Sequence, residues 1–208
     1  MVIVVGGTIG AGKTTVAKRL SESFNSKLFL EPVDNNPILD KYYEDRERYG
    51  FALQIYFLNK RFKLIKEAYR DRNNVLDRSI YEDALFTKIN RDEGNISEEE
   101  YNIYLELLDN MMEELEGLPQ KAPDIFVYLD ISFENMLKNI KKRNRPYEQI
   151  TEDNGLYEYY HKVHSMYEDW YENYNISEKI RIDMNKYDVL NDDDWNEVVE
   201  MIKEKLNR

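Results

Sequence analysis

The chain has 208 residues, of which 41 are Asp or Glu and 29 are Lys or Arg, and its formal net charge is −12. With 42% hydrophobic residues it can bury a core, which excludes a disordered chain and predicts a single domain over residues 1–208. The acidic balance argues against a protein that coats nucleic acid, because that binding needs cations to neutralise phosphates.

Short apolar runs alternate with longer helical patterns, an order typical of α/β proteins with a parallel sheet. The apolar runs predict strands, in chain order, at Val2–Val5, Lys27–Leu30, Val75–Asp77, Ile125–Asp130 and Lys179–Asp183. The helical patterns predict helices at Lys13–Phe24, Gly50–Asp71, Ser97–Glu116, Phe133–Lys142, Gly155–Tyr174 and Trp195–Leu206. We therefore expect a five-stranded, mainly parallel sheet flanked by helices.

Helix ends are also visible in the sequence. Ser97 and Glu100 have the spacing of a capping box, and Gly117-Leu118-Pro119 is typical of a helix end. The acidic run Asp192-Asp193-Asp194 favours a helix start, because carboxylates are stabilised at a helix N-terminus.

Residues that would indicate secretion or a membrane are missing. The sequence has no Cys, which excludes disulfides and thiol nucleophiles, and its only histidines, His161 and His164, argue against a histidine-rich metal site. No run approaches the roughly 20 apolar residues that span a bilayer, and Val2–Val5 is too short for a signal-peptide core. We expect a cytoplasmic protein without a membrane partner.

The segment from Gly7 to Thr14, Gly-Thr-Ile-Gly-Ala-Gly-Lys-Thr, fits the phosphate-binding loop pattern between a predicted strand and a predicted helix. Glycines let backbone N–H groups approach phosphate oxygens, and the helix N-terminus favours an anion there. Lys13 suits the β- and γ-phosphates, and the Thr14 hydroxyl suits Mg²⁺. The pattern predicts a nucleoside triphosphate site at Gly7, Thr8, Ile9, Gly10, Ala11, Gly12, Lys13, Thr14 and Thr15.

A phosphate-binding loop does not identify the reaction, because several enzyme classes share it. Asn185-Lys186-Tyr187-Asp188 spells the guanine-reading pattern of GTPases, but the chain contains no Asp-x-x-Gly segment to sense the γ-phosphate. We interpret the match as a coincidence.

Charged residues follow two of the predicted strands. Glu31 ends the second strand before Pro32, and Asp77 and Arg78 end the third. Ligands bind at the carboxyl ends of strands in open α/β sheets, so these side chains should face the phosphate site. Glu31 could accept the proton of an attacking hydroxyl, Asp77 suits Mg²⁺, and Arg78 suits phosphate.

Together these segments resemble the deoxyribonucleoside kinases, in the branch with deoxycytidine, deoxyguanosine and bacterial deoxyadenosine kinases. The resemblance runs from Ile3 to about Trp170. Glu31-Pro32-Val33 matches the family's catalytic motif, the run from Phe51 to Arg61 its base-binding helix, and the run from Asp77 to Asp83 the segment after its third strand. Arg143-Asn144-Arg145 with Glu148 resembles its arginine-bearing lid.

The resemblance implies a three-layer P-loop nucleoside kinase fold with a lid at about 138–150. It implies that Glu31 is the general base for the deoxyribose 5′-hydroxyl and that Arg78 holds this hydroxyl. The base would contact Gln54, Arg61 and Asp83, and the sugar 3′-hydroxyl would contact Tyr43 and Glu148. Lys13, Arg143 and Arg145 would stabilise the transferring phosphoryl group, and Thr14 and Asp77 would serve Mg²⁺.

Further expectations follow for the ligands and the assembly. ATP would be the donor, with its adenine near residues 183–188, and the chain would form a homodimer, for which the Ser97–Glu116 helix with Met111 and Met112 is a candidate interface. The aromatic residues between Tyr157 and Tyr171 would serve packing, and the histidines would not be catalytic.

An arginine–carboxylate pair such as Arg61 and Asp83 can accept a hydrogen bond from an exocyclic amine, which thymine lacks. We therefore expect a base that carries such an amine, and the resemblance to the short bacterial members of the family implies deoxyadenosine, with deoxycytidine or deoxyguanosine as second substrates. Two alternatives remain at this point: a nucleoside monophosphate kinase of the thymidylate kinase type, and a non-enzymatic nucleotide-binding regulatory protein.

Overall fold

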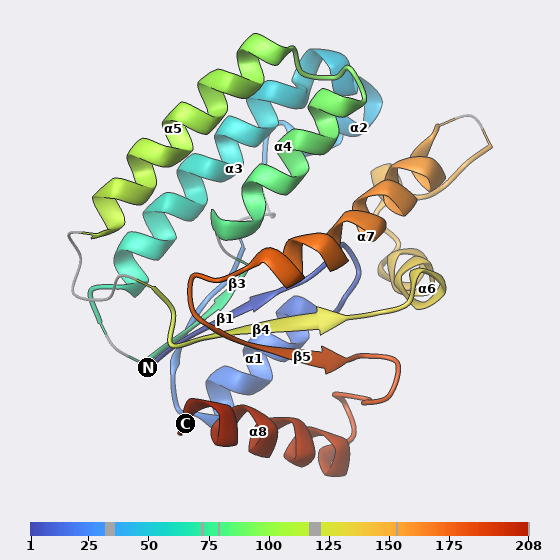
Figure 1. Ribbon diagram of the computed structural model, residues 1–208. Helices are drawn as coiled ribbons and strands as arrows, with labels where there is room; N and C mark the ends of the chain where they lie inside the picture. The colour runs from blue at the N-terminus through green and yellow to red at the C-terminus, as the bar shows by residue number, and fades with distance from the viewer. Residues whose placement is uncertain (32–35, 72, 79, 117–121, 153, 208) are drawn as a thin grey trace.

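The computed structural model describes residues 1–31, 36–71, 73–78, 80–116, 122–152 and 154–207 (Figure 1). Its strands form one sheet in the order β2-β3-β1-β4-β5, and every neighbouring pair is parallel. The strands are β1 (Val2–Gly6), β2 (Lys27–Phe29), β3 (Asn74–Asp77), β4 (Ile125–Asp130) and β5 (Glu178–Asp183). The predicted five-stranded parallel sheet is confirmed, with each strand end within one residue of its expected place.

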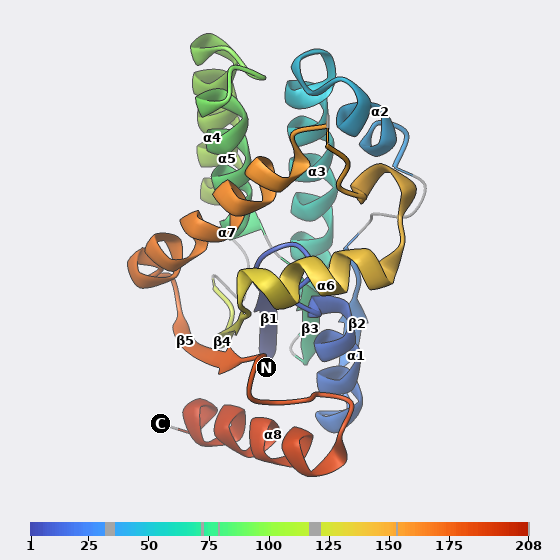
Figure 2. The same ribbon diagram turned by 90° about the vertical axis from the view of Figure 1, so that its right-hand side faces the viewer.

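Helices cover both faces of this sheet, α1 and α8 on one side and α3, α4, α5 and α7 on the other (Figures 1 and 2). Among the described residues the helices are α1 (Lys13–Ser23), α2 (Leu39–Glu44), α3 (Arg46–Ala68), α4 (Asp83–Asp92), α5 (Glu98–Glu116), α6 (Phe133–Arg143), α7 (Leu156–Asn173) and α8 (Asp192–Leu206), with 3₁₀ turns η1 (Ile80–Glu82) and η2 (Pro146–Glu148). The three-layer arrangement is therefore confirmed.

The core is built around the central strands. All five residues of β1 are buried between β3 and β4, as expected for a β-branched run in a parallel sheet. On the face covered by α7, the Tyr171 ring stacks on Tyr128 of β4 at 4.7 Å, and Trp170 packs on Phe126 at 5.3 Å. These contacts confirm a packing role for Trp170 and Tyr171.

Capping side chains explain where the helices begin. α3 starts at Arg46 rather than Gly50 because the Asp45 side chain accepts a hydrogen bond from Arg48 N at 3.0 Å. α8 starts at Asp192 rather than Trp195 because the Asn191 side chain caps it. The predicted capping box before α5 is confirmed, since Ser97 N donates to Glu100 Oε2 at 2.8 Å and Glu100 N donates to Ser97 Oγ at 3.2 Å. The predicted end at 117–119 lies outside the described residues.

Two helices were not predicted. α2 has only six residues and no side-chain cap, and it follows a turn in which the Asn36 side chain accepts a hydrogen bond from Ile38 N at 2.9 Å. In α4 the polar residues Asp83, Thr87 and Asn90 are buried together with Leu85 and Ile89, so its inner face does not stand out as apolar.

The register of the sheet brings several loops together. Val5 of β1 lies opposite Asp77 of β3, and Arg78 N donates to Val5 O at 2.8 Å. Phe29 of β2 lies opposite Leu76, so the residues that follow β1, β2 and β3 leave the sheet at the same edge. Within the described part of the chain, no helix combines the length and apolar character needed to cross a membrane.

Candidate active site

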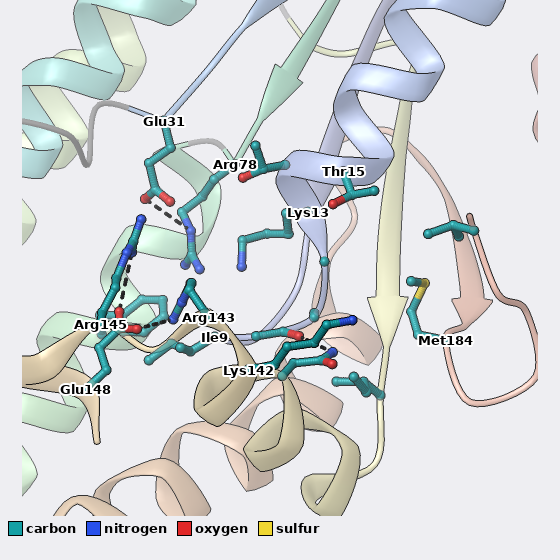
Figure 3. Close-up of a pocket in the computed structure, with 18 of the residues that line it drawn as sticks. Ile9, Lys13, Thr15, Glu31, Arg78, Lys142, Arg143, Arg145, Glu148 and Met184 are labelled. Carbon is teal, nitrogen blue, oxygen red and sulfur yellow. Dashed lines mark hydrogen bonds and ion pairs between the residues drawn. The ribbon is translucent and has the colours of Figure 1, made fainter. Parts of the chain in front are cut away.

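A cavity of about 710 Å³ lies at the carboxyl ends of the strands (Figure 3). It is lined by many of the predicted site residues: Ile9, Gly10, Ala11, Gly12, Lys13, Thr14, Thr15, Glu31, Tyr43, Gln54, Arg61, Arg78, Arg143, Arg145 and Glu148. The remaining ones contact this lining from behind: Gly7 and Thr8 through Lys13, Asp77 through Thr14, and Asp83 through Arg61. The structure thus brings the predicted residues to one place.

The loop after β1 has the backbone shape that its glycines allow. Gly10 has a φ of +76°, and a Cβ at this position would lie 2.9 Å from Met136 O of α6. This close approach is reinforced by Asn139 of α6, whose side-chain amide donates to Gly10 O at 2.8 Å. The loop is therefore held between α1 and α6, with only a glycine fitting at position 10.

Lys13 begins α1, and its ammonium group is buried inside the loop. Its Nζ donates to Gly7 O at 2.9 Å and to Thr8 O at 2.7 Å. Burial lowers the pKa of Lys13 to about 7 and the nearby Arg78 lowers it too, against the opposing effect of Glu31, Glu82 and Asp77. An anion placed in the loop would favour the charged form of this side chain, which suits phosphate binding.

Glu31 lies across the cavity from the loop, between two arginines. Its Oε1 is 3.3 Å from Arg78 Nε and also pairs with Arg61 Nη2 (Figure 3 draws the first pair). Burial raises the pKa of Glu31, but Arg78, Arg61 and Lys13 outweigh it and lower the pKa to about 2. The carboxylate is therefore ionised at neutral pH.

Arg78 is held in an unusual backbone conformation. Its φ of +69° lies in the left-handed region, which costs about 1–2 kcal/mol for a residue other than glycine. Its guanidinium donates to Tyr167 Oη at 3.2 Å and to Gly7 O at 3.4 Å, and lies 4.8 Å from the centre of the Phe86 ring. These contacts fix the guanidinium between Glu31 and the loop.

Thr14 and Asp77 form the predicted magnesium pair. The Thr14 hydroxyl donates to Asp77 Oδ2 at 2.6 Å, and the other carboxylate oxygen, Oδ1, is buried without a hydrogen-bond partner among the described residues. Burial, followed by the charge of Glu31, raises the pKa of Asp77. The described residues contain no group of three His, Cys, Asp or Glu side chains that could hold a metal. A hydroxyl beside one carboxylate fits Mg²⁺, which keeps several waters and is otherwise bound by substrate phosphates.

The far end of the cavity is framed by α3. Gln54 and Arg61 are both buried and lie two turns apart on this helix, so they face the same space. Arg61 Nη1 pairs with Asp83 Oδ1, while Asp83 Oδ2 is buried without a hydrogen-bond partner among the described residues. Leu53, Phe57 and Phe86 add apolar walls. A flat ring carrying hydrogen-bond donors would match this end.

The predicted lid residues lie on the side of the cavity opposite Lys13 and Glu31 (Figure 3). Arg143 Nη2 is 2.6 Å from Glu148 Oε2, and Arg145 Nη1 is 3.4 Å from Glu148 Oε1. Tyr43 packs against Tyr147 with their ring centres 5.3 Å apart. Cations and a carboxylate on this side thus face Lys13 and Glu31 across the cavity.

Some residues of the cavity were missed from the sequence: Tyr42 was not singled out, and Tyr159 was expected only to pack, yet both line the cavity. Asn139 and Lys142 line it from the segment predicted as the lid. Residues 184–188, near which the donor adenine is expected, line it too, and Val189 and Leu190 extend that run. The place of this run directly after the edge strand β5 was the signal for it. The expected Pro32, Val33 and Ser79 of the family motifs lie outside the described residues.

Comparisons with known proteins identify the family of this chain. A family model described as deoxynucleoside kinase matches residues 3–207. A deoxyguanosine kinase and a deoxyadenosine kinase of Lactobacillus acidophilus are each 48% identical over 206 residues, which is 99% of this chain and 90% and 96% of theirs. The solved structure of deoxyadenosine kinase from M. mycoides with bound dATP has a TM-score of 0.82 and 33% identity, and the match covers 100% of both chains. The chain therefore belongs to the deoxynucleoside kinase family, whose members are phosphotransferases.

Proposed function

We propose that the protein transfers the γ-phosphoryl group of ATP to the 5′-hydroxyl of a deoxyribonucleoside, with deoxyadenosine preferred, for deoxynucleotide salvage in the cytoplasm. One observation carries the proposal: the ionised Glu31 carboxylate and the buried Lys13 ammonium face a shared cavity. A base and a phosphate-binding cation on opposite sides of one space suit the transfer of a phosphoryl group to a hydroxyl.

In this proposal the acceptor side works through Glu31 and Arg78. The Glu31 carboxylate accepts a hydrogen bond from the 5′-hydroxyl and takes its proton as the bond between the 5′-oxygen and the γ-phosphorus forms. The bond from that phosphorus to the β–γ bridging oxygen breaks, and ADP leaves with the electron pair. Arg78, whose Nε is 3.3 Å from Glu31 Oε1, orients the carboxylate and holds the hydroxyl. Tyr43 and Glu148 bind the sugar 3′-hydroxyl. Holding the 5′-oxygen in line with the γ-phosphorus supplies much of the rate enhancement.

The donor side neutralises the charge of the triphosphate. The loop N–H groups and Lys13 bind the β- and γ-phosphates, and Arg143 and Arg145 stabilise charge on the transferring group. This role requires the arginines to exchange Glu148 for phosphate, so residues 138–150 act as a lid of the single domain. Bound Mg²⁺, held at Thr14 and Asp77, would supply charge neutralisation of the phosphates.

Replacing Asp77 by asparagine should raise the Mg²⁺ concentration that gives half-maximal activity by roughly 10- to 100-fold, because the orienting carboxylate is lost. The measurement is initial rate against free Mg²⁺ at saturating ATP and deoxyadenosine. Asp130→Asn is a matched control, since Asp130 likewise ends a parallel strand, β4, and pairs with Arg181 outside the cavity. An unchanged Mg²⁺ dependence in Asp77→Asn would remove Asp77 from the metal site.

The preference for deoxyadenosine is supported by the base end of the cavity. Asp83 Oδ2 lies buried behind Arg61 without a hydrogen-bond partner among the described residues, and in this proposal it accepts a hydrogen bond from an exocyclic amine of the base. Leaving it unpaired costs about 1–3 kcal/mol, which is about 5- to 150-fold in kcat/KM. The relatives named for deoxyguanosine and for deoxyadenosine are equally similar to this chain. The preference among the deoxynucleosides whose bases carry an exocyclic amine therefore depends on the shape of the pocket.

Comparing kcat/KM for the four deoxynucleosides with ATP tests this choice. Deoxyadenosine should rank first, deoxycytidine or deoxyguanosine next, and thymidine last by about tenfold or more. Thymidine as the best substrate would overturn the role given to Arg61 and Asp83 while leaving the kinase reaction intact. The family assignment favours this reaction over a nucleoside monophosphate kinase or a non-enzymatic regulator.

The homodimer stays a prediction. Within α5, Met111 and Met112 are partly buried against the chain's own core, whereas Ile103 is exposed. We propose that the face around Ile103, rather than the methionines, would contribute to such an interface.

A further inference from the structure

A fully buried carboxylate lies behind the phosphate-binding loop. Glu82, in η1, has 0% of its side chain exposed, and it does not line the cavity. Its Oε1 accepts hydrogen bonds from Gly7 N at 2.9 Å and from the Tyr167 hydroxyl at 3.0 Å. Burying a carboxylate is costly unless hydrogen bonds compensate it. The contacts of Glu82 therefore point to a purpose beyond filling the core.

Tyr167 connects Glu82 to the acceptor side. Its hydroxyl oxygen accepts a hydrogen bond from Arg78 Nη1 at 3.2 Å while its proton goes to Glu82. The direction follows because a guanidinium can only donate, so the Tyr167 oxygen accepts from Arg78 and its proton is directed to Glu82 Oε1. The Tyr167 hydroxyl thus joins Arg78 to the carboxylate that binds Gly7 N, beside the direct contacts of the guanidinium with Gly7 O at 3.4 Å and with Glu82 Oε1 at 4.0 Å.

The surroundings leave these groups little freedom. A Cβ on Gly6 would lie 2.9 Å from Glu82 Oε2, so β1 passes directly against the carboxylate. Trp170 Nε1 donates to Tyr81 O at 3.2 Å, which fastens α7 to η1 one turn beyond Tyr167. The link between loop, η1 and α7 is therefore rigid.

We propose that Glu82 and Tyr167 are positioning residues that set the distance between the donor loop and the Arg78–Glu31 pair. Neither side chain touches the substrates; they act through Gly7 and Arg78. A misplacement of about 1 Å can cost roughly 100-fold in rate, so a rigid link between the two halves of the site affects kcat. The inference rests on the proposed function, because it uses the roles given there to Arg78 and the loop.

Tyr167→Phe tests the link, since it removes the hydroxyl and keeps the ring that stacks on Tyr128 at 6.1 Å. Tyr171→Phe is the matched control, because Tyr171 is one turn further along α7, is buried and stacks on the same Tyr128. We expect kcat of Tyr167→Phe to fall about tenfold or more. The KM values for ATP and deoxyadenosine should change less than about twofold, whereas the melting temperature should fall below that of the control, because the buried Glu82 loses a hydrogen-bond donor.

A second pair of variants separates hydrogen bonding from packing. Glu82→Gln keeps an acceptor for Gly7 N, whereas Glu82→Leu does not, so kcat should be higher in the glutamine variant. Equal kcat in Tyr167→Phe and Tyr171→Phe would overturn the proposal, whether or not the Glu82 variants fold. So would a raised KM at unchanged kcat. Failure of the proposed function gives a different result, since the wild-type protein would then phosphorylate no deoxynucleoside.

Discussion

Replacing Glu31 by glutamine should lower kcat for deoxyadenosine phosphorylation by roughly 10²- to 10⁴-fold, because glutamine cannot take the proton of the 5′-hydroxyl. The side chain keeps its size and one acceptor oxygen, so the cavity should keep its shape. ATP binding, measured by calorimetry, should stay within about twofold of wild type, since the loop that binds phosphate lies on the other side of the cavity.

Glu44→Gln provides the matched control for this variant. Glu44 ends α2, is exposed and does not line the cavity, so its loss of charge should leave kcat unchanged. Undiminished turnover in Glu31→Gln would remove Glu31 as the base. A joint loss of turnover and ATP binding would instead assign it a role in shaping the loop.

Replacing Lys13 by methionine should lower kcat/KM for ATP by about 10³-fold, because a buried donor aimed at developing charge is removed from the phosphate site. Both kcat and the affinity for ATP should fall, since Lys13 would contact phosphate before and during the transfer. The binding of deoxyadenosine alone, followed by calorimetry, should change little, because Gln54, Arg61 and Glu31 remain in place.

Lys18→Met is the control here, because Lys18 is an exposed lysine of the same helix α1. It should retain wild-type kinetics. If Lys13→Met kept both its ATP affinity and its kcat, the loop would bind phosphate through backbone N–H groups alone. The Lys13 ammonium group would then contribute neither to ATP binding nor to phosphoryl transfer.

Much of the fold was predictable because its signals are local. The run Val2–Val5 is apolar at every position, and only a strand buried on both faces accommodates that pattern. α4 was missed for the opposite reason, since Asp83, Thr87 and Asn90 are buried beside its apolar residues. A buried polar face cannot be distinguished from a solvated one by periodicity.

The residues of the site also fall into those that a local sequence pattern predicts and those that only tertiary contacts bring together. The phosphate-binding loop is contiguous in sequence, so its pattern predicted the residues that surround Lys13. The contact between Tyr167 and Glu82 joins residues 85 positions apart, and no local pattern marks it. The double pairing of Arg61 with Asp83 and Glu31 likewise depends on how α3 lies across the sheet edge. Such contacts follow from tertiary packing and needed the structure.

The positive φ of Arg78 has a consequence for engineering this enzyme. Glycine at position 78 would relieve about 1–2 kcal/mol of backbone strain, but it would delete the guanidinium that pairs with the buried carboxylates of Glu31 and Glu82. Leaving a buried charge without its partner costs about 3–5 kcal/mol, so the glycine variant should be less stable as well as inactive. Thermostability is better sought at exposed positions far from the sheet edge, with residue 78 left unchanged.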